Sequence, residues 1–95
     1  MAEFEIEREE GGKGGRYVAR IDGAEAEMTW TASESVDVID HTFVPPELRG
    51  RSLGKALVWR AVEDARRSGR KILPICSFAA AQFRRHADWR DVLPG

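Results

Sequence analysis

The sequence predicts a small α/β protein in which helices pack against one mixed β-sheet. Short segments within residues 3–44 alternate between apolar and polar or charged side chains, as half-exposed strands do. Residues 52–68 carry apolar side chains at spacings of three and four, and a short, nearly all-apolar segment follows at 71–76. The predicted order is β-β-β-β-α-β-α, in which the last strand is reached by a right-handed β-α-β crossover. Ninety-five residues suit one domain over residues 1–95 with a modest core.

Four strands are predicted in the first half of the chain. The turn between the second and third is marked by Asp22-Gly23, a pair typical of hairpins. In the fourth strand the alternation changes phase near Asp40, which favours a β-bulge there. Pro45 ends this strand because proline cannot donate to the ladder. The four segments are 3–9, 16–22, 23–30 and 35–44.

The second half of the sequence predicts two helices with one strand between them in the chain. The helix over 52–68 is amphipathic, with Gly69 as its C-terminal cap. The segment 71–76 is apolar enough to be a central, buried strand. Ser77 is expected to cap a helix through His86, and Asp88 a last turn that follows it.

Charge is divided unequally along the chain. Residues 1–48 hold twelve acidic and four basic side chains, a net charge of −8. Residues 49–95 hold four acidic and eleven basic ones, a net charge of +7, and the two sum to the overall −1. A split of this kind favours a polyanion near the second half, although scattered basic residues on helices commonly face solvent. The single cysteine excludes an internal disulfide framework, and the acidic start is unlike a signal peptide, so we expect a cytoplasmic protein with no membrane contact.

The segment 49–55, Arg-Gly-Arg-Ser-Leu-Gly-Lys, lies between the fourth strand and the long helix. Glycines let a ligand approach the backbone closely, and a helix N-terminus offers unpaired N–H groups at the positive end of the helix dipole. Three basic side chains add charge there. The pattern is neither a Walker loop nor the dinucleotide fingerprint. It nevertheless predicts a phosphate site, because it opens the helix of a β-α-β unit.

The run V-P-P-E-L-R-G-R-S-L-G-K-A-L resembles motif A of the GNAT superfamily of N-acetyltransferases, Q/R-x-x-G-x-G/A. Arg49 takes the first position and Gly54 the last, whereas Ser52 replaces the middle glycine. The chain looks most like the minimal, single-domain GNAT proteins of this length. They have a strand ending in H-T-x-V-P, a Gly/Arg loop, a helix, and a strand ending in P-x-C. The likeness covers residues 40–93.

This resemblance implies binding of acetyl-CoA or CoA. The loop would hold the pyrophosphate through its backbone N–H groups, and the backbone of Val44 would pair with the pantetheine arm. Arg84 and Arg85 would reach the adenosine 3′-phosphate, unless both simply face solvent. The residues implied in cofactor binding are Val44, Arg49, Gly50, Arg51, Ser52, Leu53, Gly54, Lys55 and Arg84. No metal site is expected.

His41 and Cys76 are the candidate catalytic residues, since the minimal GNAT proteins share this pair. His41 on the fourth strand suits a general base. Cys76, at the end of the neighbouring strand, would protonate the leaving thiolate or accept the acetyl group itself. The two side chains are expected to meet at the cleft. The plainer alternative is a structural histidine and a small buried cysteine.

Three functions are compatible with the sequence. The first is an acetyl-CoA-dependent N-acetyltransferase acting on an unknown amine of a small molecule or protein, as a monomer or weak dimer. The second is a non-catalytic CoA-binding module, because so short a domain has little room for an acceptor pocket. The third is nucleic-acid binding, which the overall charge and the lack of an RNP-type aromatic pattern disfavour.

Overall fold

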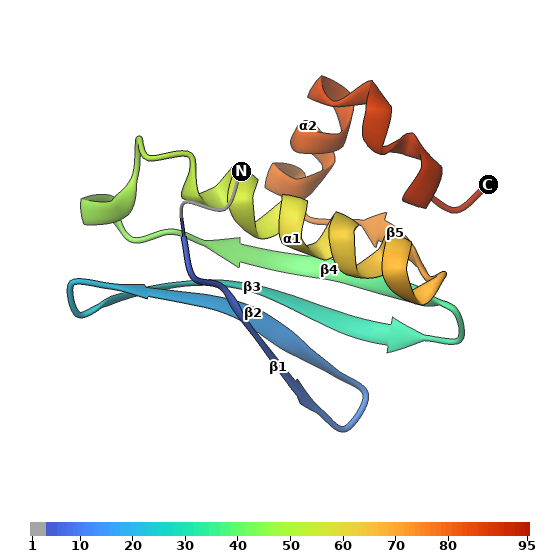
Figure 1. Ribbon diagram of the computed structural model, residues 1–95, viewed down its shortest axis with the longest axis horizontal. Coiled ribbons are helices and arrows are strands. Elements are labelled where there is room, and N and C mark those ends of the chain that lie inside the picture. Colours follow the sequence, from blue (N-terminus) through green and yellow to red (C-terminus); the bar gives the residue numbers. More distant parts are fainter. Residues whose placement is uncertain (1–3) are drawn as a thin grey trace.

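Five strands form one sheet, and their order across it is their order along the chain (Figure 1). The computed structural model describes residues 4–95. The first four strands pair antiparallel, and β4 and β5 pair parallel, so the predicted mixed sheet and crossover are confirmed. The strands are β1 (Glu7–Gly11), β2 (Gly14–Ile21), β3 (Ala24–Ser33), β4 (Val36–Phe43) and β5 (Lys71–Pro74).

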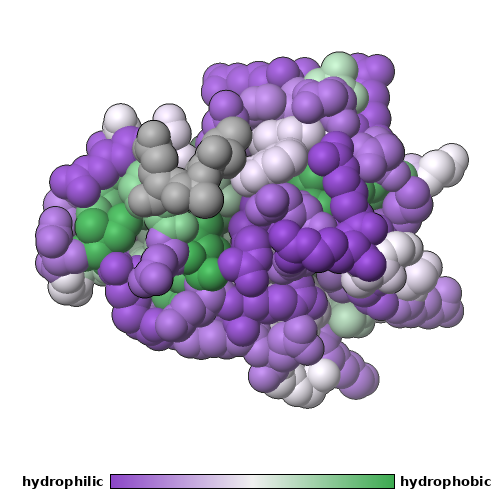
Figure 2. Space-filling view, in the orientation of Figure 1, coloured by the Kyte–Doolittle hydropathy of each residue, from purple (hydrophilic) through white to green (hydrophobic). Residues whose placement is uncertain are grey.

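Two α-helices lie on one side of this sheet and leave the other side open (Figure 1). They are α1 (Leu53–Ser68) and α2 (Ser77–Arg85), and the 3-10 turns η1 (Pro46–Leu48) and η2 (Ala87–Val92) precede and follow them. A single core joins Met28 and Ile39 of the sheet to Leu57 of α1 and Phe83 of α2. Gly69 ends α1 in the left-handed conformation, as predicted. In the view of Figure 2, hydrophilic residues cover most of the surface and hydrophobic ones show in smaller areas.

The predicted bulge lies in β4 at Asp40. Thr29 of β3 pairs with His41 and Trp30 pairs with Ile39, so Asp40 is the extra residue. Its carboxylate accepts hydrogen bonds from the hydroxyls of Thr29 at 2.5 Å and Thr31 at 3.2 Å. An inserted residue places two consecutive side chains, Asp40 and His41, on the same side of the sheet.

The position of β5 differs from the prediction. It is an edge strand rather than a central one, because no later strand of the described chain pairs with its outer side. Leu73 is 43% exposed and Ile75 is 60% exposed, and only Ile72 of this segment is fully buried against the helices. A continuous apolar run therefore predicted two covered faces where the fold covers only one.

Smaller differences concern where elements begin. The predicted strand 3–9 corresponds to β1, and its first residue lies outside the described part of the chain. The N-cap of α2 is Cys76 rather than Ser77, and its Sγ accepts a hydrogen bond from the Ala79 N–H. Asp88 lies in the first turn of η2 instead of capping it.

Within residues 4–95, none of the helices has the length and apolar character needed to cross a membrane.

Candidate active site

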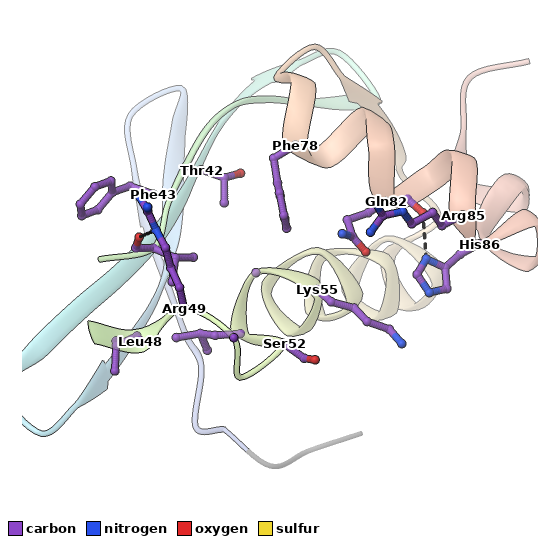
Figure 3. Close-up of a pocket in the computed structure, with 14 residues that line it drawn as sticks. Thr42, Phe43, Leu48, Arg49, Ser52, Lys55, Phe78, Gln82, Arg85 and His86 are labelled. Carbon is purple, nitrogen blue, oxygen red and sulfur yellow. Dashed lines mark hydrogen bonds between the residues drawn. The ribbon is translucent and has the colours of Figure 1, made fainter. Parts of the chain in front are cut away.

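A cleft of about 620 Å³ opens between the end of β4, the loop that follows it, the first turn of α1 and one side of α2 (Figure 3). The segment 49–55, in which the sequence predicted a phosphate site, forms one wall. Most of the residues implied in cofactor binding line it: Val44, Arg49, Gly50, Ser52, Leu53, Gly54 and Lys55. A loop–helix segment, a strand end and a second helix thus converge on one cavity.

The parallel strands separate beside this cleft. Their last registered pair is Ile39 with Pro74. The N–H groups of Ile75 and Cys76 both donate to the Ile39 carbonyl, at 3.0 and 3.1 Å. Beyond that point the bulged part of β4 continues to Phe43 without β5 beside it. The inner edge of β4 is therefore open to a ligand that brings its own hydrogen-bonding groups.

The N-terminus of α1 is arranged to receive an anion. Ser52 takes the left-handed conformation (φ 61°, ψ 25°) and its side chain makes no capping hydrogen bond. The first turn contains no acidic side chain. The leading N–H groups of the helix therefore lack a side-chain acceptor, and a phosphate oxygen would supply one. A helix N-terminus in this state is suited to a phosphate group.

Cationic side chains surround that helix end. Arg49, Lys55 and Arg85 line the cleft, and Arg49 Nε donates to the Val44 carbonyl at 3.0 Å. Arg51 and Arg84 are exposed and are not among the lining residues. Arg85 rather than Arg84 faces the cleft, because successive helical residues point about 100° apart at 3.6 residues per turn.

The structure does not bring His41 and Cys76 together. His41 pairs with Thr29, and Thr29 lies between Met28 and Trp30, whose buried side chains face the helices. By strand alternation, His41 lies on the open side of the sheet. Cys76 packs against the core on the helix side. Neither residue lines the cleft, so the expected meeting of the two side chains there was wrong.

Thr42 takes the place that His41 was expected to have. It pairs with Met28 on the helix side, lines the cleft, and its Oγ1 lies 3.4 Å from Cys76 Sγ. Cys76 Sγ also accepts from the Ala79 N–H at 3.3 Å. The signal that would have found Thr42 is the phase change at Asp40, since one inserted residue exchanges the sides that positions 41 and 42 occupy.

Three further lining residues come from α2 and its end, and the sequence did not single them out as ligand contacts: Phe78, Gln82 and His86. The Phe78 ring lies over Gly54, where an added Cβ would be 2.5 Å from the ring. His86 follows the last residue of α2 and is half-buried. Its Nδ1 lies 2.8 Å from the Gln82 carbonyl, and its ring is stacked on Trp89 at 3.9 Å between centroids. Because α2 carries no sequence motif, only its packing shows which side faces the cleft.

Comparisons with known proteins agree with this geometry. Residues 16–92 match the family model of the GCN5-related N-acetyl-transferases. Among solved structures, the chain resembles that of a GCN5-like protein from Staphylococcus aureus, with a TM-score of 0.73 and 34% sequence identity over 100% of this chain and 92% of that one. No curated protein gives a significant match. A family model that covers most of the chain, together with a shared fold at this identity, establishes that the chain belongs to the GCN5-related N-acetyltransferase family.

Proposed function

We propose that the protein is an N-acetyltransferase that takes its acetyl group from acetyl-CoA and transfers it to a primary amine. The observation that carries this proposal is the uncapped N-terminus of α1. It opens into a cleft with Arg49, Lys55 and Arg85 on its walls and the open edge of β4 at its inner end. A phosphate-binding helix end beside an unpaired strand edge suits a ligand that is anionic at one end and amide-bearing at the other.

Three groups of residues would bind three different parts of CoA. The first turn of α1 and Lys55 would hold the pyrophosphate, and Arg85 would reach the 3′-phosphate. Val44 would pair with an amide of the pantetheine arm. Its carbonyl accepts one hydrogen bond from Arg49 Nε and keeps a second lone pair, so the arm can pair with Val44 while Arg49 stays in place.

Acetyl transfer makes a bond between the amine nitrogen and the acetyl carbon and breaks the bond from that carbon to the CoA sulfur. The amine loses a proton and the leaving thiolate gains one. A thioester in the gap between β4 and β5 would have His41 on the open side of the sheet and Cys76 on the helix side. In this arrangement His41 removes the proton of an amine that arrives from the open side, and Cys76 gives a proton to the thiolate.

In an alternative covalent route, Cys76 is the first acceptor of the acetyl group. Its sulfur would attack the thioester carbonyl, the CoA thiolate would leave with the cysteine proton, and the amine would then take the acetyl group from Cys76. Intact-protein mass spectrometry separates the two uses. An acetylated protein formed from acetyl-CoA without amine, and absent in Cys76→Ser, supports the covalent route.

A non-catalytic CoA-binding module is the second candidate. One observation favours it: neither His41 nor Cys76 lines the cleft, and their side chains lie on opposite sides of the sheet. The two candidates differ in turnover. Loss of acetylation in His41→Ala with unchanged CoA affinity supports the enzyme, whereas CoA binding without acetylation of any amine in a broad screen supports the module.

The test of the cofactor site is an amide-shift titration of the isotope-labelled protein with acetyl-CoA. We expect shifts over 42–55, around Cys76 and on the side of α2 that faces the cleft, and their loss or weakening in Arg49→Ala. An unshifted spectrum at millimolar ligand would remove the proposal.

The adjacent arginines of α2 provide a test variant and a matched control for binding of the 3′-phosphate. Arg85→Ala should weaken CoA binding about tenfold, equivalent to ~1.4 kcal/mol, and leave dephospho-CoA binding unchanged. Arg84→Ala is the control and should change neither affinity. Equal losses in the two variants would place the 3′-phosphate elsewhere.

A further inference from the structure

Phe78 lines the cleft between α2 and the first turn of α1. Figure 3 shows its side chain extending from α2 toward α1, with Thr42 on the opposite wall. A Cβ placed on Gly54 would lie 2.5, 2.9 and 3.3 Å from three carbons of the Phe78 ring. The ring therefore rests directly on the backbone of α1, in a position that only a glycine leaves free. It is still 38% exposed, which is high for a phenylalanine in close contact with a helix.

Cys76 lies next to two residues that line the cleft. It is partly buried against the core and does not line the cleft, but residues on two sides of it do. Thr42 Oγ1 is 3.4 Å from Sγ, and Phe78 follows Cys76 by two residues at the start of α2. A group in the cleft that contacts both Thr42 and the Phe78 ring is therefore close to the sulfur.

We propose that Phe78 is a specificity residue that limits the size of the acyl group able to reach Cys76. The inference rests on the proposed function, in which a CoA thioester occupies the cleft. A ring held on Gly54 leaves an opening of fixed size, so short acyl groups pass and longer ones meet the ring edge. Hydrophobic sites of fixed shape discriminate single methylenes by factors of about 10–200. Phenylalanine has no proton to give, so its part is steric, and proton transfer is left to Thr42, Cys76 or His41.

The first test measures access to Cys76 without any CoA. Cys76 is the single cysteine of the chain, so alkylation reports on it alone. Rates with iodoacetamide, a small reagent, and N-ethylmaleimide, a bulky one, are compared for the wild type, Phe78→Ala and Phe78→Leu. We expect Phe78→Ala to raise the maleimide rate about tenfold more than the iodoacetamide rate, with an intermediate change in Phe78→Leu.

Phe43→Ala is the matched control, because Phe43 is an exposed aromatic residue on the rim of the same cleft whose ring points away from it (Figure 3). It should leave both rates as they are. If Phe78→Ala and Phe43→Ala change the two rates alike, or not at all, Phe78 is not the barrier.

Gly54→Ala tests the same barrier by moving the Phe78 ring instead of removing it. The added Cβ displaces the ring, so the maleimide rate should change in Gly54→Ala and show no further change when Gly54→Ala is added to Phe78→Ala. This pair keeps the inference testable if removal of the ring alone disturbs α2. A change of the same size in both backgrounds would show that Gly54 acts without Phe78, which overturns the inference.

The last test concerns acyl length. Relative to acetyl-CoA, hexanoyl-CoA should bind about tenfold better to Phe78→Ala than to the wild type. An unchanged ratio, with both ligands bound, overturns the specificity role. If neither ligand binds any variant, the proposed function fails instead, and the alkylation rates still decide whether Phe78 shields Cys76.

Discussion

Ser52, at the entrance of the cleft, has a strained backbone conformation. It has a positive φ of 61° ahead of α1, where a side chain is sterically unfavourable, and its hydroxyl makes no capping bond in return. The motif that this loop resembles has glycine at this position, which adopts the same conformation freely. The local geometry therefore explains the preference for glycine without reference to the ligand.

Ser52→Gly should raise the free energy of unfolding by about 0.5–1 kcal/mol, because relief of the left-handed strain exceeds the added freedom of glycine in the unfolded chain. Urea denaturation measures this difference. Ser52→Ala keeps a Cβ at the same φ and should bring no gain. A stabilisation by alanine equal to that by glycine would contradict the strain argument.

Gly54 has a different role, since its φ is ordinary for a helix and its constraint is contact with Phe78. Gly54→Ala should cost about 1–3 kcal/mol in the wild type through overpacking. In the Phe78→Ala background the sign should reverse to a gain of about 0.5–1 kcal/mol, because alanine is the better helix former. A double-mutant cycle of unfolding free energies measures the coupling, and a coupling near zero would show that the ring yields freely.

At the scale of elements, the crossover from α1 to β5 is tied to β4 by one ion pair. Arg70 follows the C-cap of α1, and its Nη2 lies 2.8 Å from Oδ1 of Asp37, a β4 residue that is only 8% exposed. The same Nη2 donates to the Val36 carbonyl at 3.2 Å. This pair joins the chain on both sides of the helix at the end of the sheet opposite the cleft.

Arg70→Ala should destabilise the protein by about 2 kcal/mol, because it leaves a largely buried carboxylate without its partner. Arg67→Ala is the control, since 69% of that side chain is exposed, and it should cost under about 0.5 kcal/mol. In chemical denaturation, adding Asp37→Asn to Arg70→Ala should recover part of the loss. No recovery would mean that Arg70 acts through packing alone.

For the whole molecule, a buried tyrosine connects the first hairpin to α1. The Tyr17 hydroxyl accepts a hydrogen bond from Arg8 of β1 and donates to Asp64 of α1 at 3.0 Å. Burial raises the pKa of Tyr17 above its ordinary value, and the nearby Asp64 carboxylate raises it further. The acidic first half and the basic second half of the chain are not separate surfaces, because ion pairs such as Asp37 with Arg70 connect them.

This pKa shift predicts the direction of a pH dependence. The folded protein holds the phenol proton more tightly than the unfolded chain, so the contribution of Tyr17 to stability is complete below its unfolded pKa of 10.0 and is lost as the pH rises above it. The free energy of unfolding of the wild type should fall more steeply between pH 10 and 11 than that of Tyr17→Phe. Lysine titration contributes equally to both proteins, so the difference between the two slopes reports on Tyr17. Parallel profiles would show that Tyr17 keeps its proton no better when folded.

The sequence by itself determined the local features of this protein. Alternation, the Asp22-Gly23 turn, the stripe of α1 and the cap at Gly69 predicted the elements, because each depends on neighbouring residues. The segment 49–55, in which the sequence predicted a phosphate site, lies in one wall of the cleft, and its residues come together because a loop and the helix it begins are contiguous in the chain.

Only the tertiary structure decided which distant side chains meet. The bulge at Asp40 turned His41 to the open side of the sheet and brought Thr42 to Cys76, a choice set by pairing with β3 rather than by residue type. The edge position of β5 depends on how whole elements pack, and so does the fact that Arg85 rather than Arg84 lines the cleft. The same packing placed Phe78 on Gly54, 24 positions earlier in the chain, because a contact between two helix starts leaves no periodic trace in either segment.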